Sequence, residues 1–371
     1  MKFLIINFNN GFGNTVLFNS SLKLIKDKIK SSEITILSNN RDNDLDISKI
    51  NLDISKTINF NKISIKKKID LIKNIFFGHY EYIFFPPFSS MNIFYFSLIF
   101  IFGRSIILIP VYYKKLNTPL RSIILTFLKF FRGIFNSKTI LYSDVIDKNC
   151  HEIDANLNLI KKIFSDEENI NQKYAFNSIN INIYEEYLNN YGLHKDGYIC
   201  IQYGTSHGNL TPKVWSHEKL INLISQLSKN FQVVVLGNSK DRSPLSFLET
   251  EINVKNLIGK TSMQELATLL KFSSCNICFD SGIMHLCDAM RVKSISIIGP
   301  SNLEKIKPRN KLSNIIYEKV NCSPCLIGWY FDPKSITELQ AYNECKENFK
   351  CMELISVEKV ISLVKHNHEK Y

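Results

Sequence analysis

The sequence contains no uninterrupted apolar run long enough to cross a membrane. The N-terminal run FLIIN is too short for the core of a signal peptide and leads into a glycine-rich turn, which is typical of a first β-strand. Residues 93–110 are the most apolar, but Gly103 and Arg104 interrupt them. We predict a buried helix ending at Gly103 and then a strand, rather than a membrane span. Export is not expected, so the nine cysteines should stay reduced in the cytoplasm.

Two motifs of other protein classes are also missing. A dinucleotide-binding fingerprint after the first strand would need a third glycine at position 16, where the chain has Val16, so NAD binding is not favoured. No recognisable nucleic-acid-binding motif accompanies the net charge of +12. We therefore expect no nucleic-acid partner.

The positive charge is concentrated in the first half of the chain. Residues 1–170 hold 23 Lys or Arg against 15 Asp or Glu, a surplus of +8, which leaves +4 for the remainder. This surplus favours an anionic partner such as a phosphorylated saccharide or a lipid surface, although a general bias towards Lys, Ile and Asn would also produce it. Five basic residues between Lys114 and Arg132, interspersed with aromatics, follow the apolar stretch and are compatible with peripheral membrane contact.

A chain of 371 residues is too long for one ordinary core and favours two domains. Short β-branched and aromatic runs alternate with helical patterns, which predicts an α/β protein with parallel sheets flanked by helices. A polar, asparagine-rich stretch at 165–195 marks the junction, and we predict domains at 1–175 and 176–371, the second ending in a cysteine-containing tail and a terminal helix. The expected strands are KFLIINF, EITILSN, TINFN, YEYIFF, SIILIPV and TILYS in the first half, and YICIQYG, QVVVLGN, NICFDS, SISIIGP and NIIYEKV in the second.

Segment 256–300 carries the strongest functional signal. A helix begins there with the capping-box pattern Ser262 to Glu265, and a buried strand ends at Asp280 before a Ser281–Gly282 turn and a second helix. A carboxylate that ends a buried strand is costly unless it is paired or functional. Because open α/β sheets bind ligands at the carboxyl ends of their strands, we expect Asp280 to lie in a site for a phosphate-bearing substrate.

Two other turns have residues that suit a phosphate ligand. Gly11 and Gly13 let the backbone approach a ligand just before a helix. Thr205 and Ser206 follow the strand YICIQYG, and Lys213 a few residues later offers a mobile positive charge. A surface turn with a solvated lysine is the alternative interpretation of the second turn.

The motif FDSGIMHLCDAM, followed by IIGPSN, closely resembles the signature of glycosyltransferase family 9, the bacterial ADP-heptose:lipopolysaccharide heptosyltransferase family. The segments GKTSMQELATLL, KVWSHEKLINLI, HEIDANLNLIKKIF and GFGNTVL fall in the family's order and spacing, and the resemblance is looser between about 40 and 140. It implies a GT-B fold, in which two Rossmann-like domains with parallel sheets face across a cleft. The N-terminal domain would bind the acceptor and the C-terminal domain the nucleotide sugar.

The resemblance also implies an inverting, metal-independent transfer with no cofactor besides a nucleoside-diphosphate sugar donor. The sugar, with heptose as the leading candidate, would pass to a lipid-linked anionic saccharide of lipopolysaccharide or another surface glycan. The enzyme would be cytoplasmic and could bind the inner face of the plasma membrane. Lys213 and Asp280 are implied to be catalytic. The substrate-binding residues implied in the same way are Gly11, Gly13, Thr205, Ser206, Lys213, Asp241, Thr261, Asp280, Ser281, Gly282 and His285.

One position departs from the family pattern. Members usually have an aspartate after the second glycine of the N-terminal turn, and it is the presumed general base. This chain has Asn14, whose amide cannot accept a proton at neutral pH. We favour an active transferase whose base lies elsewhere. The alternative is a nucleotide-sugar-binding protein with lost or altered catalysis.

Four cysteines near the C-terminus form a separate candidate site. Cys322 and Cys325 have the spacing of a metal knuckle, but five residues separate Cys345 from Cys351, which is wider than usual for the second half of a zinc ribbon. We expect reduced thiols with a structural role, with bound zinc as the alternative, and we assign no metal to the active site.

Overall fold

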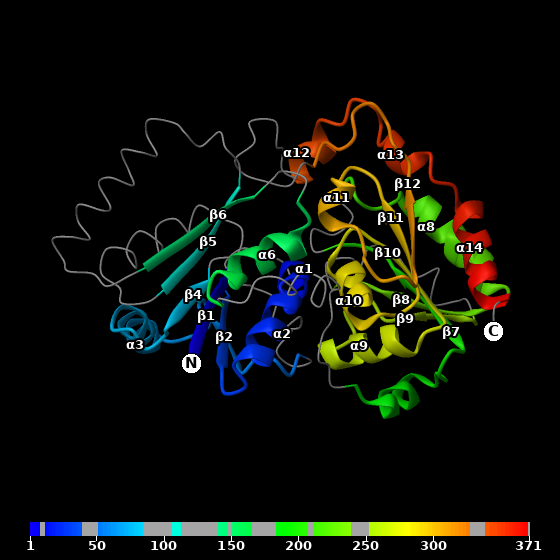
Figure 1. Ribbon diagram of the computed structural model, residues 1–371. Helices are drawn as coiled ribbons and strands as arrows, with labels where there is room; N and C mark the ends of the chain where they lie inside the picture. Colours follow the sequence, from blue (N-terminus) through cyan, green and yellow to red (C-terminus); the bar gives the residue numbers. More distant parts are fainter. Residues whose placement is uncertain are drawn as a thin grey trace. The chain divides into compact units, whose positions relative to one another are not determined.

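The computed structural model describes residues 1–7, 12–38, 51–84, 106–112, 140–146, 150–164, 183–205, 211–238, 252–326 and 338–369. These residues form two compact units, one containing the described residues up to Phe164 and the other those from Ile183 onward. Each unit is built on a six-stranded parallel sheet (Figure 1).

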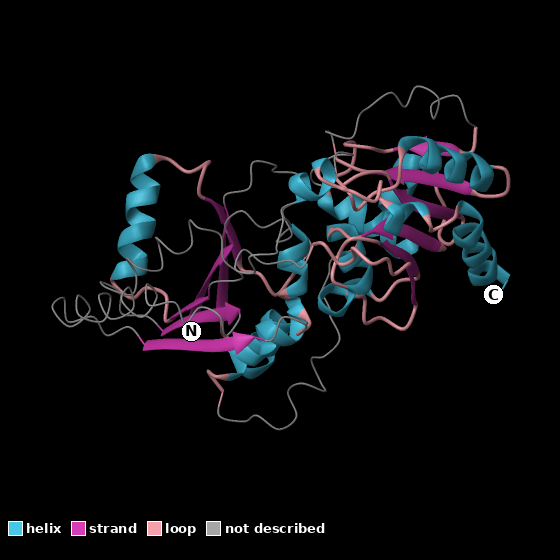
Figure 2. Ribbon diagram, turned by 90° about the horizontal axis from the view of Figure 1, so that it is seen from above, coloured by secondary structure: helices cyan, strands magenta, loops and turns pink. Residues whose placement is uncertain are grey.

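The first unit has the strand order β3-β2-β1-β4-β5-β6, with β1 in the interior of the sheet. Its strands are β1 (Lys2–Asn7), β2 (Glu33–Ser38), β3 (Lys56–Asn59), β4 (Tyr82–Phe84), β5 (Ile106–Tyr112) and β6 (Ile140–Ile146). Its described helices are α1 (Phe12–Leu17), α2 (Asn19–Lys28), α3 (Ile65–Phe76) and α6 (Glu152–Lys161). Helices α2 and α6 pack together on one face of the sheet, and α3 lies on the other side (Figures 1 and 2).

The second unit has the strand order β12-β11-β10-β7-β8-β9. Its strands are β7 (Tyr198–Gln202), β8 (Gln232–Leu236), β9 (Val254–Asn256), β10 (Cys275–Phe279), β11 (Ser294–Ile298) and β12 (Ser313–Tyr317). Its described helices are the 3-10 helix η3 (Glu185–Tyr191), α8 (His217–Ser228), α9 (Met263–Phe272), α10 (Gly282–Met290), α11 (Leu303–Ile306), α12 (Glu338–Asn343), α13 (Lys350–Glu353) and α14 (Val357–Glu369). Helices α9 and α10 cover one face of this sheet, and α8 and α14 cover the other (Figure 1).

The two sheets have the same topology. Counted from the first strand of each unit, both have the Rossmann order 3-2-1-4-5-6. In this order the chain changes direction across the sheet between strands 1 and 4, and ligands bind outside their carboxyl ends. The corresponding pairs here are β1 with β4 and β7 with β10, both parallel.

Within the described residues the expected strands and the start of α9 are confirmed, with one omission. Every expected strand is present, but β9 (Val254–Asn256) was not predicted, because its three residues are too short to show a β pattern. The capping box is formed, since Ser262 Oγ accepts from the Glu265 N–H and the Ser262 N–H donates to the Glu265 carboxylate at 2.7 Å. The helix predicted to end at Gly103 lies outside the described residues.

Candidate active site

The site starts from β7 and β10, which are neighbours at the strand-order reversal of the second sheet. All five residues of each strand are buried, so both strands are rigid supports for the loops that follow them. The loop after β7 carries Thr205, and the turn after β10 carries Asp280 and Ser281. The parallel pairing brings these loops to the same edge of the sheet.

Lys213 and Asp280 form an ion pair in this location. The Lys213 Nζ lies 3.1 Å from Asp280 Oδ2, and the two side chains are only 17% and 8% exposed. Asp280 Oδ2 also accepts a hydrogen bond from the Ser301 hydroxyl, which follows β11. The carboxylate that ends β10 is therefore paired, which is what its burial requires.

The protonation states of this group follow from its partners. Burial alone would raise the pKa of Asp280, but Lys213, His285 and the Ser301 hydroxyl together hold it below its ordinary value, so Asp280 is ionised at neutral pH. Burial lowers the pKa of His285 to about 4, with Asp280 opposing the shift and Lys213 adding to it. His285 Nε2 lies 4.0 Å from Asp280 Oδ1 and is neutral at pH 7. Lys213 is therefore the cation that balances Asp280.

Trp215 fixes the loop that carries Lys213. Its buried indole packs edge-on against Phe279, the residue before Asp280, with ring centroids 6.1 Å apart. Its indole N–H donates to the Met352 carbonyl on α13 at 3.1 Å. The loop is also closed by the hydroxyl of Thr211, which accepts from the Lys213 N–H at 3.3 Å. The contact of Trp215 with Phe279 therefore sets the position of Lys213 relative to Asp280.

Gln202, at the end of β7, joins the two loops. Its side-chain oxygen accepts from the Ser281 hydroxyl at 2.8 Å and from the Phe279 N–H at 3.2 Å. Its side-chain nitrogen donates to the Gly204 carbonyl at 2.6 Å. Gln202 is 2% exposed and was not selected from the sequence. A polar residue inside the apolar strand YICIQYG was the available signal, because buried amides need partners.

Helix α10 begins directly at the site. Ser281 is its N-cap, and its hydroxyl oxygen accepts from the Ile283 N–H at 3.2 Å while its proton goes to Gln202. The first N–H groups of a helix lack intrahelical acceptors and its dipole favours anions at that end. Gly282 starts the helix and His285 lies one turn further along. The Lys213 ammonium and the N-terminus of α10 thus both place positive charge next to Asp280.

The strand β11 and the segment after β12 support Ser301. Ser301 pairs with Leu326 in a short parallel bridge, and the Leu326 N–H donates to the Pro300 carbonyl at 3.0 Å. The Ser323 hydroxyl donates to the Gly299 carbonyl at 2.9 Å. The segment from Ser323 to Leu326, which includes Cys325, therefore holds the loop that carries Ser301, the hydrogen-bond partner of Asp280.

The remaining predicted residues fall into three groups: two in the second unit, two in the first unit and three outside the described residues. Thr205 is buried, and its carbonyl accepts from Asn238 at 2.7 Å at the end of the neighbouring strand β8. Thr261 precedes the N-cap of α9, in the loop after β9. Gly13 and Asn14 belong to α1 in the first unit. The other predicted positions, Gly11, Ser206 and Asp241, lie outside the described residues.

The C-terminal cysteines are free thiols. Cys322 is exposed, Cys325 and Cys345 are half-buried, and Cys351 is buried. Burial raises the pKa of Cys351 to about 11, and its neighbouring cysteines add to the shift. Within the described part of the chain, no group of three or more His, Cys, Asp or Glu side chains is arranged to hold a metal ion. No helix in the same residues is long and apolar enough to cross a bilayer.

Comparisons with known proteins agree with this architecture. The family model for glycosyltransferase family 9 (heptosyltransferase) matches residues 127–328, more than half of the chain. The chain is 25% identical over 251 residues to lipooligosaccharide heptosyltransferase 2 of Campylobacter jejuni, covering 63% of this chain and 73% of that protein.

Two solved structures share the fold over nearly the whole chain. The ADP-heptose lps heptosyltransferase II of E. coli has a TM-score of 0.66 at 17% identity, covering 99% of this chain and 100% of the other. The family 9 glycosyl transferase of Veillonella parvula has a TM-score of 0.61 at 16% identity, with coverages of 100% and 98%. The fold and the comparisons define a glycosyltransferase with the GT-B fold, as predicted.

The chain belongs to glycosyltransferase family 9. This confirms the family that the FDSGIMHLCDAM motif indicated.

Proposed function

We propose that this glycosyltransferase moves a heptose from ADP-heptose to a lipid-linked anionic saccharide of the lipopolysaccharide type. The names of its relatives support the donor and the acceptor, because one is a lipooligosaccharide heptosyltransferase and another is named for ADP-heptose and lps. The observation that carries the proposal is the buried ion pair of Lys213 with Asp280, at the carboxyl ends of β7 and β10 and next to the α10 N-terminus.

In the proposed step an acceptor hydroxyl oxygen forms a bond to the anomeric carbon of the sugar. The bond between that carbon and the diphosphate oxygen breaks, and its electron pair leaves with ADP. The hydroxyl proton passes to a base. Attack from the side opposite the leaving group inverts the anomeric centre. Negative charge grows on the diphosphate in the transition state, so cations placed there lower the barrier.

Lys213 and the α10 N-terminus would stabilise that charge. We propose that Lys213 supplies the cation that a metal provides in other nucleotide-sugar enzymes, which makes the transfer metal-independent. Asp280 holds the lysine in place and can accept a hydrogen bond from a sugar hydroxyl through its second oxygen. Thr205 and Ser206 would contact the diphosphate, and Asp241 and Thr261 the nucleoside.

The first unit, within the proposed domain 1–175, would bind the acceptor. The turn of Gly11 and Gly13 leads into α1, where Asn14 occupies the position of the family's base. Asn14 would orient the acceptor hydroxyl and another carboxylate would take the proton. The donor would bind the proposed domain 176–371. Since the acceptor is lipid-linked, we place the enzyme in the cytoplasm, at the inner face of the plasma membrane.

The test is a transfer assay with ADP-heptose and a heptose-deficient lipopolysaccharide acceptor, followed by mass spectrometry of the product. Addition of one heptose with an inverted anomeric linkage, unaffected by a chelator, is the expected result. A matched set of other nucleoside-diphosphate sugars gives the specificity. Transfer of a different sugar, with none from ADP-heptose, would contradict the proposed donor.

A second candidate function rests on Asn14. If no carboxylate replaces the missing base, the protein would bind the nucleotide sugar without transferring it. Isothermal titration with ADP-heptose separates the two functions, because binding without product formation identifies the second.

A further inference from the structure

Helix α3 of the first unit displays an unusual concentration of exposed apolar side chains. Ten large hydrophobic side chains are exposed in the described part of the chain, and four of them lie between Ile65 and Phe77. Ile65 is 76% exposed, Ile69 48%, Ile72 37% and Phe77 74%. Exposed hydrophobic residues are unremarkable singly, but a contiguous group marks an interaction surface.

The helical spacing puts three of these residues on one stripe. Ile65, Ile69 and Ile72 are separated by four and three positions, which places them on the same side of the helix. The buried residues Leu71 and Ile75 lie on the adjoining side, towards the sheet. The helix therefore uses one apolar stripe for the core and presents a second one to solvent.

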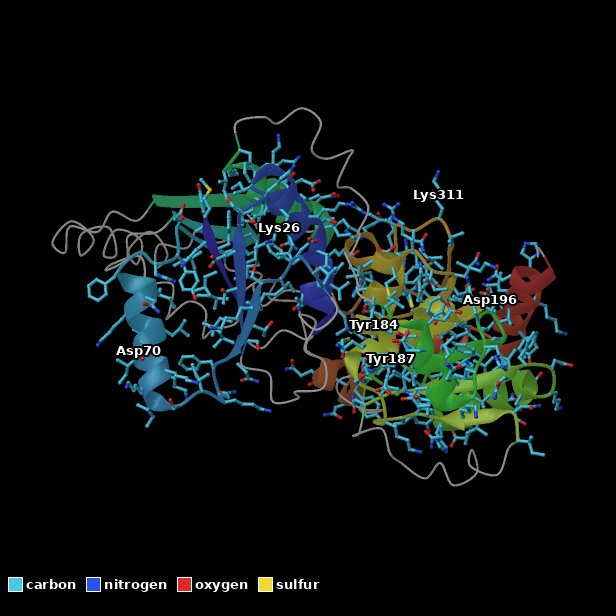
Figure 3. The ribbon with its side chains drawn as sticks, turned by 90° about the horizontal axis from the view of Figure 1, so that it is seen from below. Lys26, Asp70, Tyr184, Tyr187, Asp196 and Lys311 are labelled. Atoms are coloured by element: carbon cyan, nitrogen blue, oxygen red, sulfur yellow. The ribbon has the colours of Figure 1, made fainter. Side chains whose placement is uncertain are left out.

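Lysines border the exposed stripe. Lys66 and Lys73 flank it on one edge and Lys68 on the other, with the Lys68 ammonium 5.0 Å from the centre of the Phe60 ring. The single acidic residue of the helix, Asp70, lies away from the stripe by its position in the turn, and Figure 3 shows it on α3. Ser64 caps the N-terminus of the helix, its hydroxyl accepting from the Lys67 N–H at 3.4 Å.

We propose that this stripe, together with the flanking lysines, binds the surface of an anionic lipid bilayer. A helix with apolar residues on one side and lysines along the edges lies in the membrane interface, with the apolar side chains in the acyl boundary and the ammonium groups at the phosphates. The proposal rests on the proposed function, because a lipid-linked acceptor requires the enzyme to work at a membrane. It adds the surface through which the enzyme would reach it.

The charge pattern favours lipid over a second copy of the chain. A symmetric contact through the same stripe would bring the lysines of two copies together, which is unfavourable, whereas anionic headgroups attract them. Each lysine near an anionic surface adds to the attraction, and the attraction weakens as salt is added. Apolar burial and charge would then act together.

The experiment is co-sedimentation of the full chain with vesicles of phosphatidylcholine alone or mixed with phosphatidylglycerol. Wild-type protein should bind the mixed vesicles, bind the neutral vesicles much less, and be released at roughly 0.5 M NaCl, where charges are screened within a few ångströms. The double variant Ile69→Ser/Ile72→Ser and the double variant Lys66→Gln/Lys73→Gln should each bind at least about tenfold more weakly.

Matched controls lie in the second unit. Ile252 is 96% exposed, and Lys359 is half-exposed on α14. Ile252→Ser and Lys359→Gln should bind vesicles like the wild type. Circular dichroism and melting temperature establish that the α3 variants are folded, and the lysine pair provides the test if the isoleucine pair does not fold.

Two results would overturn the proposal. One is unchanged vesicle binding by both α3 variants. The other is that wild-type protein is a dimer by light scattering, does not bind vesicles, and becomes a monomer in the isoleucine variant. That result would make the stripe a contact between two copies of the chain. Transfer to an acceptor stripped of its acyl chains should be unchanged in the α3 variants. If wild-type protein shows no transfer at all, the proposed function fails while the vesicle result stands separately.

Discussion

The side chain of Gln202 on β7 accepts a hydrogen bond from the Ser281 hydroxyl, the N-cap of α10, at 2.8 Å. This bond crosses from the first strand of the second sheet to the turn after its fourth strand. The same oxygen also accepts from the Phe279 N–H. Gln202 therefore ties the loop that carries Thr205 to the turn that carries Asp280.

Replacing Gln202 by alanine should loosen both loops. The Ser281 hydroxyl, the Phe279 N–H and the Gly204 carbonyl would lose a buried partner, at a cost of roughly 1–3 kcal/mol for each group left unsatisfied. We expect a lower melting temperature and a higher KM for the donor. Gln226→Ala, which removes a hydrogen bond to Asn222 on the surface of α8, is the control and should change neither. An unchanged donor KM in a destabilised Gln202 variant would restrict Gln202 to a structural role.

Lys213→Met should abolish most of the transfer activity. It removes the cation proposed to stabilise the leaving diphosphate, and losses of about 10²–10³ in kcat are typical when one such group is removed. It also leaves Asp280 buried without its counter-ion, so its pKa should rise. Steady-state kinetics and titration of Asp280 by NMR are the measurements. Lys359→Met, on the surface of α14, should retain full activity, and equal activity of the two variants would refute the role of Lys213.

The stability of the enzyme should depend on pH through His285. Burial lowers its pKa to about 4, so between the ordinary histidine value near 6.5 and about 4 the unfolded chain binds a proton that the folded protein does not. Its contribution to stability is therefore complete above about pH 6.5 and is lost as the pH falls towards 4. The difference corresponds to roughly 3 kcal/mol at most.

Asp288 acts in the opposite direction, so the His285 effect must be isolated. Burial raises the pKa of Asp288 from 3.8 to about 6, and the N–H groups of Arg309 and Asn310 oppose the shift. The contribution of Asp288 to stability therefore falls as the pH rises from 3.8 to about 6. Denaturant unfolding of wild type and His285→Asn at a series of pH values gives the difference curve. That difference should shrink steadily from pH 7 to pH 4. A constant difference would show that the pKa of His285 is the same in the folded and the unfolded protein.

Asn14→Asp tests whether the base is missing. A carboxylate at this position can accept the hydroxyl proton, so transfer should be faster in the variant if wild-type Asn14 only orients the acceptor. Asn14→Ala should lower acceptor affinity without removing turnover. Single-turnover rates with both variants are the measurement. Turnover that is absent in wild type and appears in Asn14→Asp would contradict the shifted-base proposal and favour the binding protein.

Strand positions and helix starts were predictable because they depend on local patterns. The run NICFDS gave β10 and its terminal carboxylate, and Ser262 with Glu265 gave the start of α9. The three residues of β9 have no such pattern and are a strand only because β8 lies beside them. The β9 strand therefore depends on its pairing with β8 rather than on a local sequence pattern.

The candidate site was partly predictable for the same reason. Asp280 was predictable as a site residue because it ends a buried strand, and Lys213 because it follows a hydroxyl-rich turn. The distance of 3.1 Å between Lys213 Nζ and Asp280 Oδ2 could not be predicted from the sequence, since it depends on the packing of Trp215 against Phe279. Ser301 lies in the motif IIGPSN, but its hydrogen bond to Asp280 could not be predicted, because that bond arises from the adjacency of β10 and β11.

The Met352 carbonyl, which receives the Trp215 indole N–H, lies 137 positions further along the chain. The Met352 thioether also lies against Gly299, where any larger residue would meet it. During synthesis on the ribosome, the loop bearing Lys213 therefore leaves the exit tunnel long before the segment that anchors it. The unit that carries Lys213 can reach its final packing only after Met352 has been translated and has emerged.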